Sequence, residues 1–78
     1  MAQQLCIWTI YKNPSDFPGK FVARRFEGDK PTNDHYANEN VDTVRKWIHK
    51  DAGNRGQGSP HRLERQPNDD PVILESWV

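Results

Sequence analysis

The sequence predicts a small α+β protein in which an antiparallel sheet of three to four strands packs on one helix, in the order β-β-α-(β)-β. Two runs of β-branched and aromatic residues, at residues 5–11 and 72–78, are typical of strands. Between them, residues 41–52 have the apolar spacing of a helix. Segments rich in Pro, Gly, Asn and Asp separate these elements, so we expect the two ends of the chain to pair within one sheet.

Length and composition limit the core that this chain can build. With 78 residues, it is expected to form one domain over residues 1–78. Only 33% of the residues are hydrophobic and the mean hydropathy is -1.03. A single core in so small a chain rarely supplies more than about 3 to 5 kcal/mol. Cys6 is the only cysteine, so a disulfide cannot add stability, and self-association is the reinforcement that the composition favours.

The first part of the chain is predicted to form a hairpin. A strand over residues 4–12 leads into a turn at residues 13–19, which contain two prolines and a glycine. A second strand is predicted over residues 20–27. Its side chains alternate between two faces, with Phe21, Ala23 and Arg25 on one and Val22, Arg24 and Phe26 on the other. Turn formers at residues 28–34 follow, and residues 35–37 are expected to form a brief extended piece.

One helix is predicted over residues 41–52. Asn40 is a suitable N-cap, and Val41, Val44 and Ile48 recur on one face at i, i+3 and i+7. Gly53 is a plausible left-handed stop. Beyond it, residues 53–60 hold three glycines and are expected to form a loop before a short strand at residues 62–65.

Charge and hydropathy exclude some classes of partner. Eleven basic and eleven acidic residues cancel and the isoelectric point is near 6.8, so no overall field attracts nucleic acid or an anionic membrane. The first apolar run is too short and too β-branched for a signal peptide or a membrane span. Together with the lone thiol, this predicts a cytoplasmic protein that does not enter membranes.

A non-enzymatic interaction module is the function that the sequence favours. Both terminal strands carry bulky side chains on both faces, and one short helix can cover only one side of a sheet. A second subunit would cover the other side, as a homodimer or a higher homo-oligomer, and a different protein partner is an alternative. The candidate interface or binding residues are Trp8, Tyr11, Arg24, Arg25, Trp47 and Trp77. For Arg24 and Arg25, ion pairs within the chain are favoured over a fork for phosphate or carboxylate.

Three stretches resemble a family of short uncharacterised bacterial proteins: WTIY at residues 8–11, FPGKFVARR at residues 17–25, and RLxRxPxDDPVIxExW at residues 62–77. The match covers most of the chain. The resemblance implies a recurring small fold and adds no reaction, cofactor or partner. This sequence departs from the family pattern at residues 53–60, where relatives have a shorter link that contains proline.

Two other functions remain as alternatives. Single-stranded nucleic acid could stack on an aromatic and arginine sheet face formed by Trp8, Tyr11, Phe21, Phe26, Arg24, Arg25 and Lys20. A small metal-dependent hydrolase would need His35, His61 and Asp69 or Asp70 in one site. The pair Asp69-Asp70 before Pro71 is more typical of a turn. We therefore assign no catalytic, metal or cofactor-binding residue from the sequence.

Overall fold

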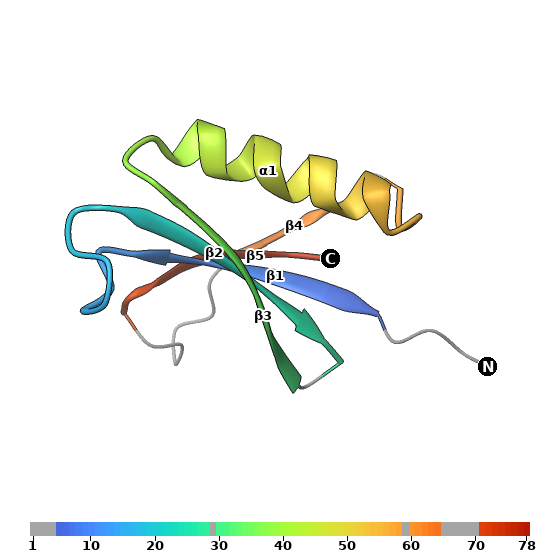
Figure 1. Cartoon of the computed structure of the whole chain (residues 1–78), viewed down its shortest axis with the longest axis horizontal. Helices are drawn as coiled ribbons and strands as arrows, with labels where there is room; N and C mark the ends of the chain where they lie inside the picture. The colour runs from blue at the N-terminus through green and yellow to red at the C-terminus, as the bar shows by residue number, and fades with distance from the viewer. Residues whose placement is uncertain (1–4, 29, 59, 65–70) are drawn as a thin grey trace.

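The computed structural model describes residues 5–28, 30–58, 60–64 and 71–78. These residues contain five antiparallel strands and one helix, together with turns and loops. The elements follow in the order β1 (Cys6–Lys12), β2 (Phe21–Glu27), β3 (Lys30–Asn38), α1 (Val41–Asn54), β4 (Arg62–Glu64) and β5 (Ile73–Trp77). The strands form one sheet in the order β3-β2-β1-β5-β4, with α1 on one side of it (Figure 1).

The two ends of the chain pair in the centre of this sheet, as predicted. β1 lies antiparallel to β5, with Trp8 opposite Trp77 and Thr9 opposite Ser76. On its other side, β1 forms the predicted hairpin with β2. The α+β class is therefore confirmed. The sheet has five strands because β3 is a full strand of nine residues instead of a brief extended piece.

β3 forms despite the turn formers in its first half because β2 offers it a free edge. Arg24 pairs with His35, but Phe26 pairs with Pro31, so the register shifts at Arg25. Such a bulge lets irregular residues remain in a strand, and proline is tolerated on an edge strand. The hydroxyl of Thr32 fixes the bulge by donating to the carbonyl of Arg25 at 2.9 Å.

The helix begins where the sequence predicts and ends later. The side chain of Asn40 accepts a hydrogen bond from the backbone N–H of Asp42 at 2.9 Å, which confirms the N-cap. Gly53 does not stop the helix, which continues to Asn54. The left-handed residue after the helix is Gly56, with φ 70°. Glycine inside a helix costs only about 1 kcal/mol, which the packing of the last turn offsets.

The core lies between α1 and the first three strands. Its fully or largely buried members are Cys6, Trp8 and Ile10 of β1, Ala23 of β2, and Val44, Ile48 and Ala52 of α1. The apolar stripe predicted for the helix is thus confirmed, as is the burial of Cys6. No helix among the described residues has the length and apolar character needed to cross a bilayer.

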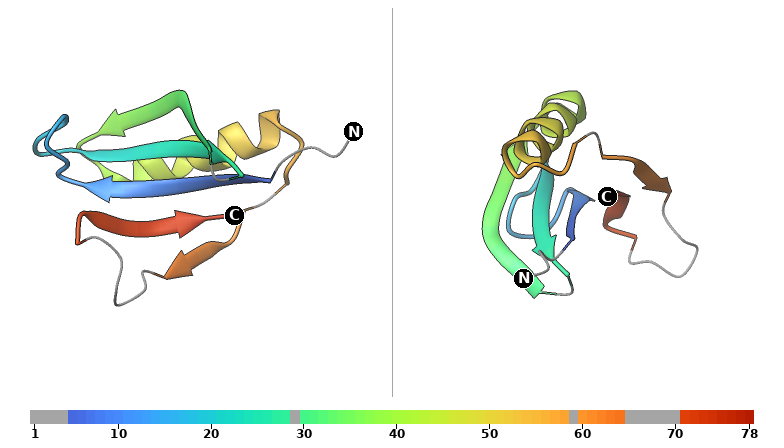
Figure 2. Two further views of the ribbon diagram at one scale, coloured as in Figure 1. Left: turned by 90° about the horizontal axis from the view of Figure 1, so that it is seen from below. Right: turned by 90° about the vertical axis from the view of Figure 1, so that its right-hand side faces the viewer.

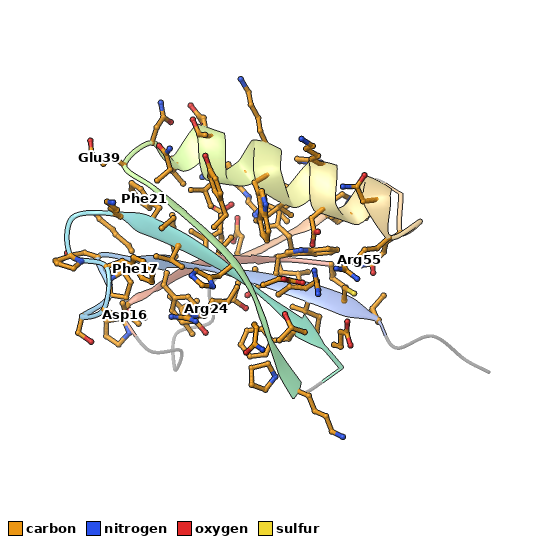
Figure 3. The ribbon with its side chains drawn as sticks, viewed as in Figure 1. Asp16, Phe17, Phe21, Arg24, Glu39 and Arg55 are labelled. Atoms are coloured by element: carbon orange, nitrogen blue, oxygen red, sulfur yellow. The ribbon has the colours of Figure 1, made fainter. Side chains whose placement is uncertain are left out.

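The opposite side of the sheet carries no helix, and we call it the helix-free face. Figure 2 shows it toward the viewer in the left panel, and the right panel shows α1 over β1–β3 with β5 and β4 beyond the helix. At one end, the 13–19 loop bends back onto this face. Asp16, which Figure 3 labels beside Phe17 and Arg24, pairs with Arg24 at 2.5 Å, and the rings of Phe17 and His35 lie 5.6 Å apart. Val22, on the same face of β2, is fully buried.

A side chain takes the place of a strand where β1 extends past β5. The amide of Gln57 donates to the carbonyl of Cys6 at 2.9 Å and accepts from the N–H of Cys6 at 3.1 Å. These are the two bonds that a residue of a neighbouring strand would make. Gln57 thereby fastens the segment after α1 to the sheet.

We expect Ile48→Ala to lower the free energy of unfolding by about 2 to 5 kcal/mol, because the fully buried side chain would leave a cavity under the helix. Urea denaturation followed by circular dichroism measures this. Lys50→Ala on the exposed side of α1 is the control and should change stability by less than about 0.5 kcal/mol. Equal effects of the two variants would contradict the core assignment.

Candidate functional site

A buried arginine lies at the centre of the molecule. β2 places Arg25 on the helix side, opposite Trp8 of β1, and its side chain is only 4% exposed. Charged side chains are almost never buried to this degree unless they are paired. The residues around Arg25 therefore decide whether this position is structural or available to a ligand.

Carboxylates from three elements surround the Arg25 guanidinium. Nη1 donates to Asp51 of α1 at 3.1 Å, and Nη2 donates to Asp34 of β3. Glu27 lies 3.8 Å from Nη2. Arg55, at the C-terminal end of α1, approaches the same two aspartates at 3.4 and 3.6 Å (Figure 3). We call Arg25, Asp34, Asp51 and Arg55 the Arg25 cluster.

The Arg25 cluster is also tied to the aromatic core. The indole N–H of Trp8 donates to the same oxygen of Asp51 that Arg25 contacts, at 2.9 Å. Burial by itself would lower the pKa of Arg25, but the hydrogen bonds and charges of Asp51 and Asp34 outweigh it and raise that pKa. Arg25 therefore stays charged. Its Nε is buried without a hydrogen-bond partner among the described residues.

A second ion pair joins α1 to the C-terminal strand. The guanidinium of Arg45 donates two hydrogen bonds to the carboxylate of Glu75, from Nη2 at 2.7 Å and from Nε at 3.1 Å. Trp77 donates its indole N–H to the same carboxylate at 2.6 Å, and the ring of His49 meets the Trp77 ring edge-on at 5.1 Å. Glu75 is only 5% exposed, so these bonds hold β5 under the edge of the helix.

The environment of Glu75 favours its ionised form. Burial would raise the pKa of this carboxyl, but the hydrogen bonds from Arg45 and Trp77 and the charges of Arg45 and Arg62 outweigh burial and lower it below its ordinary value of 4.5. A carboxylate that is ionised at neutral pH and held by two hydrogen bonds from one arginine is better suited to a structural role than to proton transfer.

Several apolar side chains on the helix-free face are partly or largely exposed to solvent. Ile7 and Phe26 lie opposite each other and are half-buried, and Tyr11 follows on the same face of β1. Leu63 of β4 lies opposite Ser76 of β5, and Ser76 lies opposite Thr9 of β1, so Leu63 is on the same face as Thr9. Leu63 is 48% exposed. Leu5, just before β1, is 55% exposed. Leu5 and Leu63 are the most exposed large apolar side chains of the described residues.

A shallow depression adjoins β4. It has a volume of about 220 Å³ and is lined by Arg62, Glu64, Leu74 and Glu75. Its charged groups are one arginine and two glutamates, and Glu75 is already held by Arg45. The depression therefore offers little that is specific to a small ligand.

The candidate residues from the sequence fall into different environments. Trp8 and Arg25 lie in the core and meet through Asp51. Arg24 and Tyr11 lie on the helix-free face, where Arg24 forms the expected ion pair within the chain. Two further candidates are half-buried on the helix side: Trp47 stacks on Tyr36 with ring centres 5.8 Å apart, and Trp77 binds Glu75.

The acid and base candidates show no shared site in the part of the chain that the structure describes. His35 Nδ1 lies 3.1 Å from the carbonyl oxygen of Asn33, and the backbone of His61 pairs with Val78. No group of three or more His, Cys, Asp or Glu in the described ranges is arranged to hold a metal ion. Asp69 and Asp70 lie outside the described residues.

The sequence did not reveal the carboxylates that pair with Arg25 and Arg45. For Asp51, the only available signal was its spacing of four residues from Arg55, which predicts an ion pair between those two residues. Asp34 belongs to a segment that was predicted as a turn, so nothing indicated its approach to Arg25. Glu75 stands in an apolar strand, where an isolated charge is a sign of a buried pair.

Comparisons with protein-family models, with curated proteins and with solved structures gave no match. The resemblance to short bacterial proteins therefore stays a prediction.

Replacing Arg25 should be far more damaging than replacing its neighbour in sequence. We expect Arg25→Met to lower the free energy of unfolding by about 3 to 5 kcal/mol, because the mostly buried Asp51 would lose its closest cation and keep only Arg55 at 3.6 Å. Arg24→Met removes an exposed ion pair and should cost less than about 1 kcal/mol. Arg25→Lys keeps the positive charge but cannot donate to Asp51 and Asp34 from two separate nitrogens. Its loss of unfolding free energy should lie between the losses of the other two variants. Urea denaturation of the three variants tests this order, which equal losses would refute.

Glu75 should make the fold sensitive to acid. Because its pKa is lowered in the folded state, its contribution is complete above the ordinary value of 4.5 and is lost as the pH falls through the folded-state pKa. The difference in unfolding free energy between the native chain and Glu75→Gln should therefore be largest near neutral pH and shrink in acid. Denaturation curves recorded from pH 7 downward measure the difference; a constant gap would show that Glu75 is not the titrating group.

Proposed function

We propose that this chain is a cytoplasmic, non-enzymatic interaction module that acts as a homodimer or a higher homo-oligomer, with the helix-free face as its contact surface. The observation that carries this proposal is the apolar row of Ile7, Phe26 and Leu63 on the side of the sheet that α1 does not cover. An antiparallel sheet can leave one face in water, but apolar side chains gathered on such a face are a mark of an interaction site.

The distribution of polar groups supports a binding role over catalysis. The most deeply buried charges, Arg25 and Glu75, are engaged with partners from the same chain and join the helix to the sheet. Catalytic groups in a site need free lone pairs or protons that face a substrate. On the opposite side of the sheet, Ile7 and Phe26 are partly exposed and Leu63 is exposed, and such apolar side chains suit a binding surface.

Single-stranded nucleic-acid binding receives less support as the alternative. Of the aromatic and basic residues expected on one platform, Trp8, Phe21 and Arg25 lie on the helix side of the sheet. Tyr11, Phe26 and Arg24 lie on the other side, and Arg24 is paired with Asp16. A stacking platform needs its aromatic rings on one accessible face.

The concentration dependence of the molecular mass tests the proposal. In sedimentation or light scattering from roughly 10 µM to 1 mM protein, we expect the mass to rise above that of one chain. Ile7→Thr combined with Phe26→Thr should weaken association at least about tenfold, because both apolar side chains leave the helix-free face. A monomer at every concentration would overturn the proposal.

A matched control separates association from stability. Val41→Thr makes a similar change at a partly buried position on the helix side. It should leave association unchanged at temperatures where the fold is intact. If Val41→Thr weakened association as much as the pair on the helix-free face, another surface would be responsible.

A further inference from the structure

β4 presents hydrogen-bonding groups at one edge of the sheet. It is the last strand beyond β5, as Figure 2 shows, and pairs with β5 on one side only. His61 and Val78 exchange both backbone hydrogen bonds, at 2.7 and 2.9 Å. Since antiparallel pairs alternate, Leu63 also turns its backbone groups toward β5. The N–H and C=O of Arg62 and Glu64 therefore point outward from the sheet.

These outward groups are self-complementary about a two-fold axis. If a second copy of β4 lies antiparallel with its Leu63 opposite this Leu63, each Arg62 falls opposite the Glu64 of the other copy. Both residues turn their backbone groups toward the partner, so the two copies form four hydrogen bonds. A shift of one residue would bring the inward-turned groups of Leu63 to the contact. A shift of two residues would pair outward-turned groups again, but it would place Arg62 opposite Arg62 or Glu64 opposite Glu64, and these like charges repel. The pairing rule and the charges together favour the register centred on Leu63.

The side chains favour the same register. Arg62 and Glu64 lie on the helix side, are exposed, and form no salt bridge with another described residue. Glu64 stands directly opposite Glu75, and like charges in that position repel. An arginine from a second copy would give Glu64 the cation that its own chain does not. On the other side, Leu63, at 48% exposure, would contact its own symmetry mate.

The other edge of the sheet is poorly suited to such pairing. β3 contains Pro31, which has no N–H to donate, and its ladder is interrupted by the bulge opposite Arg25. Proline, bulges and charges are the usual means by which edge strands avoid added strands. Of the two edges, β4 alone offers regular strand geometry, though over three residues.

We propose that two copies of this chain join edge to edge through β4, in antiparallel register about Leu63, and form one continuous ten-stranded sheet. This inference rests on the proposed function, self-association, and adds to the contact through the helix-free face a second contact with a defined edge and register. It is compatible with packing through the helix-free face, because the edge contact lies in the plane of the sheet. The pairing aligns the two helix-free faces side by side as one wider surface.

Charge reversal tests the register. Arg62→Glu places two glutamates opposite each other at both ends of the contact, and Glu64→Arg places two arginines there. Each variant alone should associate at least about tenfold more weakly than the native chain. The double variant Arg62→Glu, Glu64→Arg restores opposite charges and should associate like the native chain. An equimolar mixture of the two single variants should also associate, as a heterodimer. Circular dichroism verifies that each variant is folded.

Cross-linking gives a measurement that does not depend on charge. Non-hydrogen-bonded antiparallel pairs hold their Cα atoms about 4.5 Å apart, within the range of a disulfide. Leu63→Cys should therefore form a covalent dimer under mild oxidation, while the native Cys6 is buried and should not react. Lys50→Cys, exposed on α1, is the matched control and should remain monomeric under the same conditions.

The outcomes separate this inference from the proposed function. If the native chain associates but neither charge reversal weakens it, or mixing fails to restore association, the edge register is wrong while self-association stands. If the native chain is monomeric at every concentration, both are wrong. Rescue by mixing together with selective cross-linking at residue 63 supports the register.

Discussion

The buried charge of Arg25 is the constraint around which the fold is arranged. A guanidinium in the middle of β2 and beneath a helix is tolerable only if carboxylates reach it from neighbouring elements. Asp51 comes from the last turns of α1, and Asp34 comes from the bulge in β3. The bulge and the rotation of the helix about its axis are therefore coupled, since each aims one aspartate at the same cation. Trp8 joins the arrangement through Asp51.

The placement of the helix explains the uneven character of the sheet. α1 packs on β1, β2 and β3, so these strands bury most of the core. β5 and β4 lie toward the other border of the sheet, and β5 is joined to the helix by the hydrogen bonds of Arg45 to Glu75 and by the contact of the Trp77 ring with His49. Among the described residues, the other side of the sheet is therefore covered only by the 13–19 loop at one end, and a short edge strand, β4, lies at its border. The helix-free face and the β4 edge are the two surfaces proposed for association, and both lie outside the part of the sheet that α1 covers.

The sequence was sufficient for features that depend on local periodicity. The hairpin of β1 and β2, the two-faced alternation of β2 and the N-cap at Asn40 were all predicted. β3 was underestimated, because its pairing depends on the free edge of β2 and on the bulge at Arg25, which are tertiary effects. The helix passed Gly53 for a similar reason: packing of the last turn overrides local propensity. The carboxylate partners of Arg25 are distant in sequence, so no short pattern could reveal them.

Gln57 has a consequence for the behaviour of the molecule in a crowded solution. β1 extends past the end of β5, and there the backbone N–H and C=O of Cys6 would otherwise have no partner on the side of β1 that faces β5. The side-chain amide of Gln57 occupies both groups. An extended segment of an unfolded or misfolded chain therefore finds no template for fibril growth at this stretch of β1.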